Sequence, residues 1–276
     1  MSKETIHLER RDAVVILTMD RPLRRNAFND RMFEALERVT RELKEHLPRA
    51  IVITGGGDKA FCAGFDIHPD NPLVSGLIDA VEKKNQASAH KLIHDIRKIV
   101  DGFVSLPVPI IAAINGLAYG GGAELAVRCD LRVMDPNAVI CFSEVRLGLM
   151  PDWGGGAALA RLIGASRAAD VILTARQIQA GEAINFGLVN RICQSNCLEE
   201  AVALADMIAA NSPRAVSYTL ALIRQSRNLT LNQTLDLEAE KAVSLIGSGE
   251  YFYGVSAFLE KRKPEFPDFD PGVEGI

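Results

Sequence analysis

Residues 114–125 read INGLAYGGGAEL, an apolar run that passes through three consecutive glycines into a helix-like segment. A similar break occurs in residues 60–69, AFCAGFDIHP, where a nearly apolar run ends at Gly64. Because glycine has no Cβ, a ligand can approach the backbone N–H groups closely at both places. N–H groups at the start of a helix also favour a negative charge. Two such groups from separate loops can hold one carbonyl oxygen, an arrangement known as an oxyanion hole.

The glycine run 120–122 is also compatible with two simpler roles. A nucleotide-binding loop is disfavoured, because the run is not G-x-G-x-x-G and no Lys-Ser or Lys-Thr pair follows it. A tight strand-to-helix turn, whose glycines serve only the backbone, is an alternative that the sequence leaves open.

Hydrophobic periodicity along the chain predicts an α/β protein. Strand patterns occupy 13–19, 50–54, 107–114, 131–134 and 138–142. Helical patterns occupy 28–47, 88–105, the segment starting at 123, 156–175, 198–210, 214–226, 231–249 and 251–262. Asn26 or Asn29 is expected to cap the first helix. Segment 68–85 has mixed polarity without a clean period, so we expect a long mobile excursion there.

Composition narrows the function classes. The 276 residues carry a net charge of −4, which gives no basic excess for nucleic acid. No run of 18 uncharged apolar residues predicts a membrane span, and the N-terminus lacks the apolar region of a signal peptide, so a cytoplasmic location is expected. The five cysteines include no C-x-x-C pair and are expected to be reduced thiols. His90 and His94 lack a third ligand, so no metal is expected.

Five fragments in order resemble the enoyl-CoA hydratase/isomerase (crotonase) superfamily. They are KAFCAGFDI (59–67), IAAINGLAYGGGAELAVRCDLRV (111–133), FSEVRLGLMPDWGG (142–155), AINFGLVNRI (183–192) and AFLEKRKPEF (257–266). The resemblance implies a crotonase-like spiral of repeated β-β-α turns, with the coenzyme A thioester site in a core of residues 1–197. It also implies a helical region, 198–276, that builds homotrimers, often paired into hexamers. The implied oxyanion-hole donors are the backbone N–H groups of Phe65 and Gly121.

The same resemblance places three candidate catalytic carboxylates. Glu124 and Glu144 match the two catalytic glutamates of the hydratases, where hydration of a 2-enoyl thioester needs one group to activate water and another to protonate C2. Asp152 stands where many hydratases have glycine and where some dienoyl-CoA isomerases have a base. Each also fits a plainer role: Glu124 complements a helix dipole, Glu144 is a strand-end residue, and Asp152 caps a helix. Trp153 either lines the acyl pocket or belongs to the core.

The resemblance further implies contacts to the coenzyme A part of the substrate, and no separate cofactor. The implied contact residues are Arg24, Arg25, Ala60, Ala63, Phe65, Asp66, Ile67, Phe258 and Lys261. The leading hypothesis is therefore an enoyl-CoA hydratase. The alternatives are an isomerase or another hydro-lyase that uses Asp152, and a catalytically silent member acting as a scaffold or RNA-binding protein. The acidic net charge and the presence of both glutamates argue against the silent member.

Overall fold

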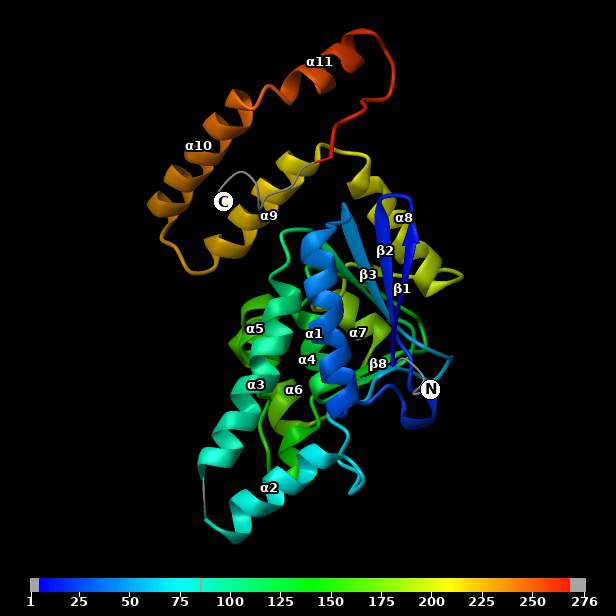
Figure 1. The fold of residues 1–276 in the computed structure, drawn as a ribbon, viewed down its shortest axis with the longest axis vertical. Helices are drawn as coiled ribbons and strands as arrows, with labels where there is room; N and C mark the ends of the chain where they lie inside the picture. Colours follow the sequence, from blue (N-terminus) through cyan, green and yellow to red (C-terminus); the bar gives the residue numbers. More distant parts are fainter. Residues whose placement is uncertain (1–4, 85, 269–276) are drawn as a thin grey trace.

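Two sheets form the core of the computed structural model, which describes residues 5–84 and 86–268 (Figure 1). The larger sheet has the strand order β1-β2-β3-β5-β7-β10, and the smaller has the order β4-β6-β8-β9. Among the described strands, only the β1–β2 and β8–β9 pairs are antiparallel. The strands are β1 Ile6–Arg11, β2 Val14–Met19, β3 Ala50–Gly55, β4 Ala60–Cys62, β5 Ile110–Ile114, β6 Leu117–Tyr119, β7 Leu131–Met134, β8 Val139–Cys141, β9 Ile178–Gln179 and β10 Arg191–Ile192.

The chain runs through these sheets as a spiral. Strands β3, β5 and β7 each enter the larger sheet, and the strand that follows each of them, β4, β6 or β8, enters the smaller one. A helical segment then returns the chain to the larger sheet, as parallel neighbours require. The spiral of β-β-α turns expected from the sequence is thereby confirmed.

Helices cover both faces of the larger sheet. The helices of the described residues are α1 Asp30–Glu45, α2 Pro72–Glu82, α3 Gln86–Val104, α4 Gly121–Arg128, α5 Gly155–Ile163, α6 Ala165–Thr174, α7 Ala180–Asn185, α8 Cys197–Ala209, α9 Pro213–Ser226, α10 Leu231–Gly247 and α11 Tyr251–Leu259, with the 3-10 turns η1 Pro22–Arg24 and η2 Glu144–Leu147. Strand side chains alternate between the faces. Val15 and Leu17 pack in the cluster that includes α1, whereas Val14 and Ile16 pack in the cluster that includes α8. Burial on both sides explains why β2 reads as a continuous apolar run.

The expected mobile excursion at 68–85 is wrong in its main part, because Pro72–Glu82 is helix α2 (residue 85 lies outside the described residues). The helix begins at Asn71, whose side chain accepts a hydrogen bond from the N–H of Leu73, and Pro72 occupies the first turn. Its larger apolar side chains recur at helical spacing, at Leu73, Val74, Leu77, Ile78 and Val81, although none of its side chains is buried. This spacing and the Asn-Pro pair at the start of the segment are the local signals that indicate a helix.

Helices α9 to α11 extend beyond the sheets, at the opposite end of the molecule from α2 (Figure 1). Helix α10 has no buried side chain, and α11 has only Ala257. Large apolar side chains on these helices are exposed: Leu231, Leu235, Val243, Ile246, Phe252, Val255, Phe258 and Leu259. In the described ranges, no helix is both long enough and apolar enough to cross a membrane.

Candidate active site

The N–H of Phe65 is left free by the way its backbone pairs. Phe65 forms an isolated parallel bridge with Phe28. The N–H of Phe28 donates to the carbonyl of Gly64 at 2.7 Å, and the N–H of Asp66 donates to the carbonyl of Phe28 at 2.8 Å. Successive N–H groups of an extended chain point to opposite sides. The N–H group of Phe65 therefore points away from Phe28, because that of Asp66 points toward it. It donates to no acceptor among the described residues.

Gly121 supplies the second free N–H at a place where the two glycine loops touch. It is the first residue of α4, so its N–H has no partner within the helix. A Cβ added at Gly64, whose φ is +87°, would lie 2.8 Å from the nitrogen of Gly121. The loops are therefore in direct backbone contact, and only glycine fits at position 64. Two N–H groups from adjoining loops form a candidate oxyanion hole.

Glu124 is fully buried and held by backbone N–H groups from the loop that leads into α5. Its carboxylate accepts hydrogen bonds from the N–H groups of Asp152 at 3.1 Å, Trp153 at 2.9 Å and Gly155 at 2.7 Å. A Cβ at Gly155 would lie 2.4 Å from the Cα of Glu124, so glycine permits this close approach. These contacts fix the carboxylate in one orientation. A surface residue that only complements a helix dipole does not need such contacts.

Glu144 is also buried, yet both of its carboxylate oxygens lack a hydrogen-bond partner among the described residues. Buried polar atoms rarely lack a hydrogen-bond partner. Where one does, a catalytic role or an unoccupied binding position is a common explanation. Its Oε1 would lie 3.7 Å from a Cβ placed on Gly120, the residue before the second donor. A partnerless carboxyl group thus lies beside the candidate hole, where a bound ligand can reach it.

The three carboxyl groups influence one another. Burial raises the pKa of Glu124, and the charges of Glu144 and Asp152 raise it further. Burial raises the pKa of Glu144, against a lowering by its own backbone and by the Glu124 side chain, and the charge of Asp152 also raises it; burial raises the pKa of Asp152 as well. Carboxyl groups with raised pKa values can keep a proton near neutral pH and act as general acids. The site therefore has both acid and base capacity beside two free N–H groups.

Asp152 does not cap a helix, and Trp153 belongs to the core. The helix-cap alternative for Asp152 is wrong, because the N-cap of α5 is Gly154 and no side chain caps the helix. The ring centroid of Trp153 lies 5.5 Å from that of Phe28 and 5.3 Å from that of Phe33. Trp153 also lies under the candidate hole, since a Cβ on Gly121 would come within 2.6 Å of its ring.

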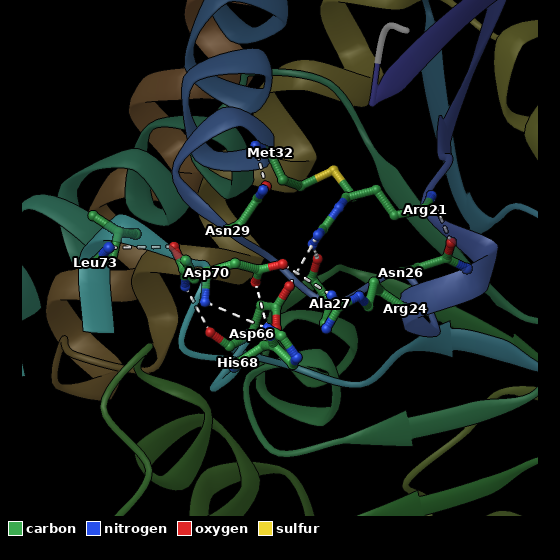
Figure 2. A network of polar contacts seen from close by, with 11 residues as sticks. Arg21, Arg24, Asn26, Ala27, Asn29, Met32, Asp66, His68, Asp70 and Leu73 are labelled. Atoms are coloured by element: carbon green, nitrogen blue, oxygen red, sulfur yellow. Dashed lines mark hydrogen bonds and ion pairs between the residues drawn. The ribbon is translucent and has the colours of Figure 1, made fainter. Parts of the chain in front are cut away.

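Several residues expected to bind coenzyme A lie together. Arg25 and Ala60 line one cavity of about 210 Å³, which Lys59 also lines. The N–H of Ala63 donates to the carbonyl of Arg25 at 2.9 Å. Arg24 is paired with Asp70 at 3.0 Å (Figure 2). The sequence does not single out Lys59, because one lysine after a glycine loop has no distinctive pattern.

The other expected contact residues lie elsewhere. Ile67 is exposed, whereas the side chain of Asp66 is buried and paired with Arg21 at 2.9 Å (Figure 2). Phe258 and Lys261 are exposed, and α11, which carries Phe258, lies at the far end of the molecule from α2 (Figure 1). In Figure 1, α11 also lies well apart from α4, which begins at Gly121.

Asn26 is a structural residue that the sequence suggests only as a helix cap, a role that Asn29 fills instead. Asn26 is completely buried. Its Nδ2 donates to the carbonyls of Gly56 at 3.0 Å and Ala60 at 2.8 Å, and its Oδ1 accepts from the N–H of Arg21 at 2.9 Å. Asn26 therefore joins the turn before α1 to the walls of the cavity.

Metal ligands are not gathered at any one place in the part of the chain that the structure describes. Residues 5–84 and 86–268 contain no cluster of three or more His, Cys, Asp or Glu side chains able to hold a metal ion. His90 and His94 lie with their ring centroids 6.2 Å apart and stacked on α3.

Comparison with known proteins agrees with the geometry. Residues 9–269 match the family model described as enoyl-CoA hydratase/isomerase. The chain is 32% identical to the short-chain-enoyl-CoA hydratase of Clostridium acetobutylicum, over 96% of this chain and 98% of that protein. It is 33% identical to the crotonyl-CoA hydratase of Syntrophomonas wolfei, over 96% and 99%. The crystal structure of an enoyl-CoA hydratase from Bacillus anthracis superposes with a TM-score of 0.85 at 33% identity, covering 95% of this chain and 98% of that one. The chain belongs to the enoyl-CoA hydratase/isomerase family.

Proposed function

We propose that the protein is an enoyl-CoA hydratase that adds water across the 2,3 double bond of a 2-enoyl-CoA thioester. The observation that carries the proposal is the carboxyl group of Glu144, which is buried without a hydrogen-bond partner beside two free backbone N–H groups and whose charge raises the pKa of Glu124. The hydratase names of the relatives point to the same reaction.

In the proposed reaction, the thioester oxygen accepts hydrogen bonds from the N–H groups of Phe65 and Gly121. One glutamate takes a proton from water while the water oxygen bonds to C3, and the π electrons move toward the thioester oxygen as an enolate. The other glutamate then delivers a proton to C2. The hole stabilises the enolate, an effect typically worth about 3–4 kcal/mol per donor. Coenzyme A enters as part of the substrate, and no separate cofactor takes part.

The direct test follows the ultraviolet absorbance of the conjugated enoyl thioester in crotonyl-CoA. Loss of this absorbance in proportion to enzyme, with 3-hydroxybutyryl-CoA as product, supports the proposal. If the absorbance persists with crotonyl-CoA and with longer 2-enoyl thioesters, the proposal is overturned.

A second candidate function is isomerisation of a longer or dienoyl thioester. It is favoured by Asp152, whose carboxyl group interacts with both glutamates and does not cap α5. We expect Asp152→Asn to leave crotonyl-CoA hydration within about threefold, since its backbone N–H still supports Glu124. Proton exchange at C4 or beyond in longer thioesters should disappear. Mass spectrometry of deuterium uptake in heavy water measures this, and equal uptake at C4 by both proteins would exclude the role.

For the coenzyme A part of the substrate, we propose contacts from one chain by Arg24, Arg25, Ala60, Ala63, Phe65, Asp66 and Ile67. Phe258 and Lys261 would reach it from a neighbouring subunit, because α11 lies far from the site in its own chain. The cavity between Arg25 and Ala60 supports the first group. Residues 1–197 would then form the catalytic core and 198–276 the oligomerisation region.

The same arrangement predicts a trimer or a hexamer in solution. Val243 and Ile246 of α10 and Phe258 of α11 are exposed by 63% or more, and such apolar surface is stabilised by burial against another copy. Light scattering should give three or six times the 30.0 kDa mass of the chain. A single 30.0 kDa species at micromolar concentration would contradict the prediction.

A further inference from the structure

We infer that Arg21 is a positioning residue for the Phe65 N–H, acting on the reaction without touching the substrate. The inference rests on the proposed function, because it concerns one of the two donors of the proposed oxyanion hole. The observation behind it is that the guanidinium group of Arg21 donates hydrogen bonds to both chain segments of the backbone bridge between Phe28 and Phe65.

The bridge between Phe28 and Phe65 is short and isolated. Two backbone hydrogen bonds hold it, and on one side the N–H of Ala63 also donates to the carbonyl of Arg25 at 2.9 Å. Arg21 reaches both of its chains: Nη1 donates to the carbonyl of Ala27, the residue before Phe28, and Nη2 donates to Oδ2 of Asp66, the residue after Phe65, at 2.9 Å (Figure 2). The guanidinium therefore fixes the two backbones relative to each other at the place where the hole donor is set.

Both ends of this contact are well anchored. The backbone N–H of Arg21 donates to Asn26 Oδ1 at 2.9 Å, and its carbonyl accepts from the N–H groups of Arg24 and Asn26, each at 2.9 Å. The carboxylate of Asp66 also accepts from the N–H of His68 at 3.1 Å through Oδ1. A movement of Asp66 would thus be passed directly to its neighbour Phe65.

The chemistry of arginine suits this task better than that of lysine. The planar guanidinium group donates in two fixed directions at once, here to a carbonyl and a carboxylate. The ammonium group of lysine is a single nitrogen, so it cannot donate to both acceptors with good geometry. The pair is largely removed from water, since the Arg21 and Asp66 side chains are exposed by 16% and 7%. A buried ion pair is by itself weak support for a role in stability, which leaves a geometric role to be tested.

The test measures carbonyl polarisation directly. Butyryl-CoA carrying ¹³C at the thioester carbonyl is a saturated analogue that cannot be hydrated, and its infrared carbonyl stretch reports the strength of the hole. Wild-type protein should lower this frequency on binding, because both donors polarise the bond. Arg21→Gln should lose about half of the shift, the share of one of two donors. It should also lower kcat for crotonyl-CoA by about 10- to 100-fold with KM changed by less than about threefold.

Further variants separate positioning from folding. Arg21→Lys keeps the charge and should give an intermediate shift and kcat, and Asp66→Asn should resemble Arg21→Gln. The double variant Arg21→Gln/Asp66→Asn should be no worse than either single variant, because both remove one contact. Arg11→Gln is the matched control: it removes an arginine paired with Glu9 at 2.6 Å and Glu199 at 3.1 Å, away from the hole. It should leave the carbonyl shift and kcat unchanged.

Thermal unfolding checks each variant, and if Arg21→Gln does not fold, Arg21→Lys and Asp66→Asn give the decisive readings. The inference is overturned if folded variants keep the wild-type carbonyl shift and kcat, or if Arg11→Gln loses the shift equally. Failure of the proposed function has different signatures: the enoyl absorbance of crotonyl-CoA would persist with wild-type protein, and if the hole itself were absent, wild-type protein would bind butyryl-CoA without lowering the carbonyl frequency.

Discussion

Glu144→Gln is expected to lower kcat for hydration of crotonyl-CoA by about 10²-fold or more, the contribution of one general acid or base. An amide has nearly the same shape as the carboxyl group but cannot accept or deliver the required proton. Neither oxygen of Glu144 has a hydrogen-bond partner among the described residues, so the substitution breaks no hydrogen bond there. The variant should therefore fold normally while losing activity.

Stability provides a second reading of the same variant. The pKa of Glu144 is raised in the folded protein, so above the ordinary glutamate value of about 4.3 the folded state binds more protons than the unfolded state. The free energy of unfolding then decreases as pH rises through this window. Glu144→Gln removes that loss, so its Tm relative to wild type should increase from low to neutral pH.

The measurements are kcat from enoyl absorbance and Tm from circular dichroism. Glu45→Gln, at an exposed position on α1, is the control and should change neither. Glu124→Gln should lose a similar share of activity and also lose stability. The carboxylate of Glu124 accepts from three backbone N–H groups, and the NH₂ group of glutamine cannot accept those hydrogen bonds. Wild-type kcat in Glu144→Gln would remove Glu144 from the mechanism.

Gly64→Ala is expected to lower kcat by about 10²-fold, the cost of misplacing a hole donor. The new Cβ would lie 2.8 Å from both the nitrogen of Gly121 and the carbonyl oxygen of Tyr119. Both are backbone atoms, so the clash is relieved only by moving the two loops apart. The φ of +87° adds strain for any residue with a Cβ, of order 1–3 kcal/mol.

A second glycine separates strain from displacement. Gly187 has a φ of +70° but nothing within 4 Å of an added Cβ. Gly187→Ala should therefore lose stability while keeping kcat within about twofold. Chemical denaturation and initial-rate kinetics on both variants give the comparison. If Gly64→Ala keeps wild-type kcat, the contact between the two loops is not needed for the reaction.

The parts of the fold and the site that could be predicted from the sequence have local signals. Helix α1 has an apolar face and an Asn29 cap. The glycine run 120–122 marks the start of α4, and Gly64 marks a sharp bend after β4. Motifs beside those loops single out the carboxylates Glu124 and Glu144, and the structure places both of them next to the loops.

The features that the sequence does not reveal depend on contacts between distant segments. The three N–H donors to Glu124 come from residues 28 to 31 positions later in the chain, and the pairing of Arg21 with Asp66 spans 45 positions. No local pattern encodes such separations, because they follow from how the turns of the spiral stack.

That stacking places the residues of the candidate site on separate turns of the spiral. The segment after β4 supplies Phe65, the segment after β6 supplies Gly121 and Glu124, and the segment after β8 supplies Glu144 and then Asp152. In the proposed reaction, carbonyl binding would therefore depend mainly on the first two turns of the spiral, and much of the proton chemistry on the third. Substitutions in the third turn would change where protons are added or removed along an acyl chain without altering the proposed carbonyl site. The architecture would thus let the chemistry of the site change one turn of the spiral at a time.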